Sequence, residues 1–228
     1  MNFEMTDFSN KGLYLAFGDS NIMDLSRNAI DALAEQYWHD PEKLLEQTKG
    51  MEDFRACSIC PRKDAHDLCQ TLKPVLPILA NLDSFVSYDM VDAVYRDEDE
   101  LLHIARSTMA NALQYVSMLG LTEYCATGRK YRKYYDGIIP IAGIEESIKR
   151  IYLNIYWLHK GNMPEIKEVI KQFNEEITLI TGNVMKRLGL ICKSDAFLNA
   201  FYNAQVGTEL LTLYMEELMQ QTFTESEL

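Results

Sequence analysis

Long apolar runs and positive charge are both scarce in this sequence. No run approaches the roughly 18 or more apolar residues of a membrane-spanning helix, and the longest candidate, 137–144, is short and contains Pro140. The chain has 22 lysines and arginines against 34 aspartates and glutamates, a net charge of −12. Nucleic-acid binding needs cations that face the phosphates. We therefore expect neither a membrane span nor a nucleic-acid partner.

Secretion signals are also lacking. Segment 1–11 is polar and acidic, without the basic start and apolar stretch of a signal peptide. We therefore expect a cytoplasmic protein, in which thiols stay reduced. The chain has only five cysteines, and at 47% hydrophobic residues it can bury a core without disulfides. Its cysteines are more plausible as core residues, metal ligands or redox groups than as disulfides.

Apolar residues at helical spacing predict four long helices after residue 96. In the first, Asp97 is placed to cap the helix together with Glu100, and Gly128 is a plausible stop. Four amphipathic helices joined by short loops predict an all-α antiparallel bundle. The four stripes are Leu102, Ala105, Met109, Ala112, Val116 and Leu119; then Ile144, Ile148, Ile151, Ile155 and Leu158; then Ile166, Val169, Phe173, Ile177, Ile180, Val184 and Leu188; then Phe197, Phe201, Ala204, Leu211, Met215 and Leu218.

The first 96 residues have weaker patterns. Residues 11–18 could form a short extended piece, 24–38 have helical spacing, and Pro41 opens a short helix with Leu44 and Leu45. Residues 68–79 continue a helix that two prolines break or kink. Residues 84–95 are ambiguous between helix and strand. We therefore divide the chain into a smaller, mainly helical N-terminal subdomain, 1–96, a four-helix bundle, 97–222, and a frayed tail, 223–228.

The strongest chemical signal is a segment with three of the five cysteines and one of only four histidines. Cys57 and Cys60 have the two-residue gap that lets a turn direct both sulfurs at one ion. If Asp64 caps a helix, His66 and Cys69 lie three residues apart on one helical face. Cys57, Cys60, His66 and Cys69 could thus close a tetrahedral, structural zinc site.

Other interpretations of this segment remain open. An iron–sulfur cluster usually takes four cysteines, and Cys125 or Cys192 could supply the fourth ligand instead of His66. Cys57 and Cys60 could also form a redox pair. In the plainest interpretation, Cys69 is a small buried side chain, His66 lies on the surface and the rest is loop.

Three further motifs are incomplete for the functions they suggest. Residues 16–20, Ala-Phe-Gly-Asp-Ser, resemble the nucleophile block of GDSL-type hydrolases, but the late aspartate and histidine pair that the resemblance implies is missing. Glu100 and His103 form a single E-x-x-H step, whereas a di-iron bundle needs two. Residues 129–135 are basic and aromatic, a composition that favours either a small anionic ligand or cations at a helix C-terminus.

A ligand cluster without a complete catalytic set favours a binding protein over an enzyme. The leading hypothesis is a cytosolic, non-enzymatic metal-binding protein that acts as an adaptor, regulator or assembly factor through its Cys-rich site. A protein partner or a homodimer fits that role. The alternatives are an iron–sulfur redox or sensor protein and a metal-free protein-interaction module.

Overall fold

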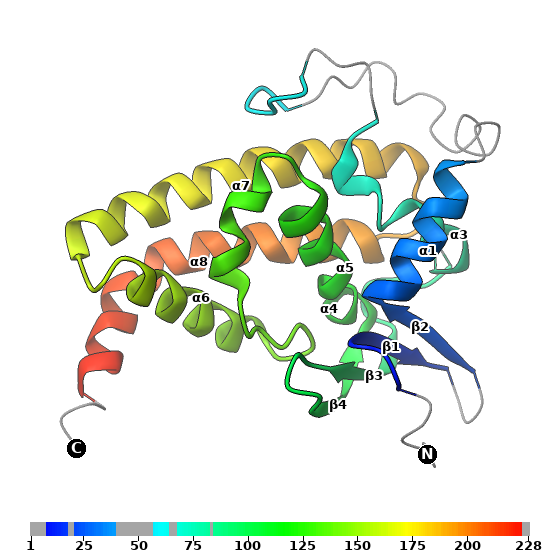
Figure 1. Ribbon diagram of the computed structural model, residues 1–228, viewed down its shortest axis with the longest axis horizontal. Helices are drawn as coiled ribbons and strands as arrows, with labels where there is room; N and C mark the ends of the chain where they lie inside the picture. The colour runs from blue at the N-terminus through cyan, green and yellow to red at the C-terminus, as the bar shows by residue number, and fades with distance from the viewer. Residues whose placement is uncertain (1–7, 18–20, 40–56, 64–67, 83, 225–228) are drawn as a thin grey trace.

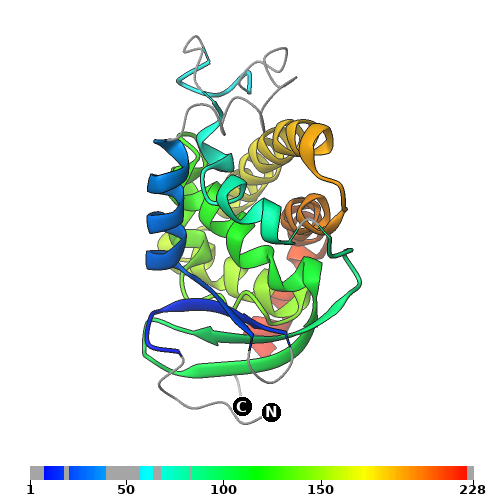
Figure 2. The same cartoon turned by 90° about the vertical axis from the view of Figure 1, so that its right-hand side faces the viewer.

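The computed structural model describes residues 8–17, 21–39, 57–63, 68–82 and 84–224. These residues form seven α-helices and a four-stranded antiparallel sheet. The prediction of an all-α four-helix bundle is therefore wrong, because the fold is mixed α/β. Figures 1 and 2 show the sheet at one end of the molecule, with the helices packed against one of its faces.

The sheet consists of β1 (Gly12–Ala16), β2 (Ile22–Ser26), β3 (Met90–Arg96) and β4 (Leu102–Thr108), in the spatial order β2-β1-β3-β4. All five residues of the inner strand β1 are buried. Leu13 and Leu15 face the helices and join the main core, whereas Tyr14 joins a small cluster with Phe8 and Val94 on the other face. The N-terminal segment thus covers part of the outer face of the sheet.

The first predicted long helix is instead a β-hairpin followed by short helices. Strands β3 and β4 are joined by a turn in which Glu100 has a φ of 66° and the Leu101 N–H donates to Asp97 Oδ1 at 2.9 Å. The spacing of Leu102, Ala105 and Met109 fits a helix, but the turn and the pairing with β3 outweigh that pattern. The hairpin also spans residues 96 and 97, between which the predicted boundary of the N-terminal subdomain lies.

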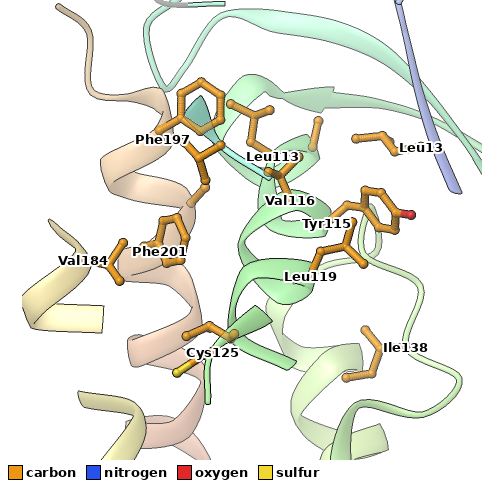
Figure 3. Packing of buried hydrophobic residues seen from close by; sticks show 14 of the residues in the cluster. Leu13, Leu113, Tyr115, Val116, Leu119, Cys125, Ile138, Val184, Phe197 and Phe201 are labelled. Atoms are coloured by element: carbon orange, nitrogen blue, oxygen red, sulfur yellow. The ribbon is translucent and has the colours of Figure 1, made fainter. Parts of the chain in front are cut away.

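Three short helical segments follow this hairpin: α4 (Met109–Ala112), α5 (Gln114–Leu119) and η3 (Gly120–Tyr124). Both α4 and α5 are buried against α8 (Ala196–Thr224). Figure 3 shows the contact, with Leu113 and Val116 near Phe197 and Phe201. The segment η3 is a π-helix, a rare conformation that often marks a functional site.

The other three predicted long helices are confirmed. They are α6 (Ile144–Leu158), α7 (Met163–Ile191) and α8. The predicted stripe of α7 is buried at six of its seven positions, from Ile166 to Leu188. Figure 1 shows α7 and α8 side by side as a long helical hairpin, and the Thr208 hydroxyl donates to Asn174 Oδ1 across it at 2.9 Å.

The remaining helical segments are α1 (Arg27–Trp38), η2 (Gln70–Leu72), α3 (Leu76–Leu82) and the 3-10 helix η4 (Gly128–Tyr135). The predicted helix 24–38 begins later than expected, because β2 takes its first residues and Ser26 caps α1 through a bond from the Ala29 N–H. The helix expected after Pro41 lies outside the described residues. Of the helices in the described ranges, none is long and apolar enough to cross a bilayer.

Candidate functional site: a cavity lined by four cysteines

Three of the predicted ligands meet a fourth cysteine around one small cavity. Cys57, Cys60, Cys69 and Cys125 all line it. Its volume is about 40 Å³, enough for a water molecule, which needs ~10–15 Å³, and far below the roughly 300–1,000 Å³ of small-molecule sites. We call it the thiol cavity. Its chemistry must therefore come from the thiols themselves or from an occupant of very few atoms.

A tight turn presents the first two thiols. The Cys60 N–H donates to the Cys57 carbonyl oxygen at 2.8 Å, which closes the turn. The Thr127 hydroxyl donates to the Ile59 carbonyl oxygen at 3.1 Å. This long-range bond holds the turn against the segment that follows Cys125. A stretch that is local in sequence is thereby fixed to the helical layer.

The other two thiols come from the ends of two short helical segments. Cys69 is not helical and directly precedes η2. Cys125 ends η3, and its sulfur accepts a bond from the Gly128 N–H at 3.3 Å. A Cβ at residue 128 would lie 2.1 Å from the Leu121 carbonyl oxygen. Only glycine fits there, so Gly128 fixes the tight bend that presents Cys125.

The four thiols divide into two pairs by exposure. Cys57 and Cys125 are buried, whereas Cys60 and Cys69 are half-buried. Burial raises the pKa of Cys57 to about 11, with a further rise from the neighbouring thiols, while the buried Arg187 acts in the opposite direction. Burial also raises the pKa of Cys125. The two buried thiols are therefore neutral near pH 7.

The prediction of a metal-binding group is wrong for the part of the chain that the structure describes. In those ranges no three histidine, cysteine, aspartate or glutamate residues are grouped so that they could hold a metal ion. The predicted geometry requires a helical Cys69, but Cys69 is the non-helical residue before η2, with φ −57° and ψ 116°. His66 lies outside the described residues, so its role as the fourth ligand stays a prediction. The zinc ion stays a prediction too.

The two possible fourth cysteines of the iron–sulfur alternative lie in different places. Cys125 joins the thiol cavity, whereas Cys192 follows the end of α7 and does not line it. The cluster itself stays a prediction. The cysteine spacing does not indicate which of these two residues joins the other three. The fold does, because η3, which ends at Cys125, lies against η2, whereas the end of α7 leads into α8.

The remaining motifs have other surroundings. Glu100 lies in the β3–β4 turn, and the ring of His103 bonds Asp97 Oδ2 at 2.8 Å, which stabilises the hairpin. Residues 18–20 of the hydrolase-like block lie outside the described residues. The basic and aromatic stretch 129–135 forms most of η4, where Tyr131 packs against Phe173 of α7 with ring centroids 4.8 Å apart.

Comparisons with known proteins identify a family without assigning a function. The family described as Domain of unknown function (DUF6901) matches residues 30–225, most of the chain. No curated protein and no solved structure matches. The matched region contains all four cysteines of the thiol cavity.

Proposed function

We propose that this chain, which belongs to the DUF6901 family, is a thiol-based redox sensor that regulates a partner protein in the cytosol. The observation that supports this function is the convergence of Cys57, Cys60, Cys69 and Cys125 on one small cavity. Cytosolic thiols are kept reduced, so disulfides that form there are usually transient and serve catalysis or sensing.

The arrangement favours Cys57 and Cys69 as the reacting pair. Of the three neighbouring thiols, Cys69 contributes most to the raised pKa of Cys57, and both residues line the same cavity. Cys69 is half-buried and accessible to an oxidant, whereas Cys57 is buried. Cys69 therefore reacts first and Cys57 resolves the product.

The oxidant in this scheme is a hydroperoxide. The Cys69 thiolate attacks it and becomes a sulfenic acid, with release of an alcohol or of water. The Cys57 sulfur then attacks the Cys69 sulfur, a disulfide forms and water leaves. Overall, two thiols lose two hydrogens. Because the pKa of Cys57 is high, only a small fraction is thiolate near pH 7, and we expect the second step to be slow.

Peptide mapping tests the pair directly. The purified protein is treated with hydrogen peroxide, the remaining thiols are alkylated, and a tryptic digest is analysed by mass spectrometry. Trypsin cleaves after Arg55, Arg62 and Lys63, so a Cys57–Cys69 disulfide joins two peptides. A Cys57–Cys60 disulfide stays within one peptide. We expect the joined peptides, and we expect a thiol reductant to separate them.

Three serine variants complete the test. Cys69→Ser should abolish the joined peptides, Cys60→Ser should leave them, and Cys192→Ser serves as the matched control outside the cavity. Joined peptides that persist in Cys69→Ser would contradict the proposed pair. Freshly purified protein that contains about one zinc per chain, or an iron chromophore, would instead overturn the proposed function, because these cysteines would then be metal ligands.

A further inference from the structure

A polar cleft is lined in part by Thr122, Glu123 and Tyr124 of η3, the segment that ends at Cys125. It has a volume of about 520 Å³, within the range of small-molecule sites. Gln70 lines both this cleft and the thiol cavity. We call it the cationic cleft, because four cations and two carboxylates line it: Arg27, Lys73, Arg129 and Arg132, with Asp31 and Glu123.

The π-helix η3 sets the geometry of the cleft. A Cβ at Gly120 would lie 2.7 Å from the Thr71 carbonyl oxygen. Glycine therefore lets η3 approach η2 closely, which brings Lys73 beside Tyr124. The Lys73 ammonium lies 5.7 Å from the centroid of that ring. The hydroxyl of Tyr124 in turn donates to Asp31 of α1.

A nearly buried carboxylate orients two of the arginines. The side chain of Glu123 is 14% exposed, and its two oxygens accept from Arg27 Nη2 at 3.1 Å and from Arg132 Nε at 2.9 Å. The backbone carbonyl of Glu123 accepts from Arg129 Nε at 2.6 Å. Three guanidinium groups from two distant segments are thus fixed around one residue.

The charges of the cleft are not balanced. Arg27 and Arg132 pair with Glu123, and Arg27 also lies 3.8 Å from Asp31. Within the described ranges, neither Lys73 nor Arg129 forms an ion pair with a carboxylate. In a chain with a net charge of −12, two cations held without carboxylates at one cleft form a local site for a dianion.

We propose that the cationic cleft binds the phosphate group of a small phosphorylated molecule. A phosphate monoester carries up to two negative charges near pH 7, which matches Lys73 and Arg129. Guanidinium groups bind phosphate oxygens through paired, charge-assisted hydrogen bonds. The volume of the cleft leaves room for the rest of a metabolite beside the phosphate.

Calorimetric titration of the full chain with inorganic phosphate tests the proposal. We expect saturable binding at one site, and we expect acetate at the same ionic strength to bind much more weakly, because it has a single charge. Higher salt should weaken phosphate binding, since the cleft is open to solvent. Absence of saturable binding to the unaltered chain, or equal binding of acetate, would overturn the proposal.

Lys73→Ala is the decisive variant. The Lys73 side chain is not hydrogen-bonded to any described residue, so its removal should leave the fold intact, which thermal unfolding verifies. Phosphate affinity should decrease by about ten-fold, the size expected for one lost charge-assisted bond. Lys133→Ala is the matched control, because Lys133 is exposed on η4 and does not line the cleft. A loss in Lys133→Ala that equals the loss in Lys73→Ala would place the phosphate elsewhere.

Discussion

The thiol cavity and the cationic cleft are both lined by Gln70 and by residues of one short segment, yet their chemistry differs. Four thiols and Arg62 are among the residues that line the cavity of about 40 Å³, whereas six charged side chains line the cleft of about 520 Å³, which is open to solvent. Residues 120–128 contribute to both. Burial raises the pKa of Cys57 and of Cys125 in the cavity, whereas the charged groups of the cleft lie where it opens to solvent.

The largest effect should come from a substitution in the shared segment 120–128. In Gly128→Ala, the new Cβ would meet the Leu121 carbonyl oxygen at 2.1 Å, and relief of that clash requires movement of the backbone between Cys125 and Arg129. We expect a loss of roughly 3 kcal/mol in the free energy of unfolding, measured by urea denaturation.

Gly182→Ala is the control for this change. Gly182 lies inside α7, and nothing is within 4 Å of an added Cβ. Alanine should therefore stabilise the chain by up to about 1 kcal/mol through its helix propensity. Equal effects of the two substitutions would show that residue 128 does not require glycine.

A smaller effect should be confined to the cleft. In Glu123→Ala, Arg27 and Arg132 lose the carboxylate that orients them. We expect a loss of about 2 kcal/mol, because these bonds involve charged groups and the carboxylate is nearly buried. Glu98→Ala, which removes the exposed ion pair with Lys11, should cost less than about 0.5 kcal/mol. Unaltered reactivity of Cys60 toward an alkylating reagent would show that the cavity side is independent.

The smallest expected effect is a decrease in stability with rising pH that comes from the Cys57 thiol of the cavity. The folded chain raises the pKa of Cys57 to about 11, above the value of about 8.5 for a free thiol. Burial of the neutral Cys57 thiol contributes to the free energy of unfolding fully below about pH 8.5. That contribution is lost as pH rises from about 8.5 toward 11, because the thiol ionises first in the unfolded chain. Between pH 7 and pH 9 we expect a loss of about 1 kcal/mol from this group. Cys57→Ala should show a correspondingly shallower decrease in stability over this range. The same slope in both proteins would contradict the pKa of Cys57.

Helices with a continuous apolar stripe could be predicted from the sequence. In α7, the residues from Ile166 to Leu188 recur at helical spacing, and the helix buries that stripe. The hairpin of β3 and β4 could not, because Leu102, Ala105 and Met109 fit a helix as well as a strand. The strand conformation is determined by a turn with Glu100 at positive φ and by the pairing of β3 with β1, whose residues are distant in sequence.

The two sites also differ in how much of each could be predicted from the sequence. The proximity of Cys57, Cys60 and Cys69 could be predicted, because these residues are close together in the chain. The choice of Cys125 over Cys192 depends on how η3 packs. The cleft could be predicted only in part, because the basic stretch 129–135 indicates an anion site. Its other residues Arg27, Lys73 and Glu123 come from separate segments that only the tertiary fold brings together.

The central place of β1 also has a consequence for the order of folding. It pairs with the neighbouring β2 on one side, but on the other its residue Leu15 pairs with Ala93 of β3, a partner far along the chain. Closing such a long loop is slow, whereas the α7–α8 hairpin forms from neighbours. Residues 57–69 lie inside that loop. We therefore expect the sulfurs of this segment to be exposed to solvent until late in folding, which makes the nascent chain more vulnerable to oxidation than the finished protein.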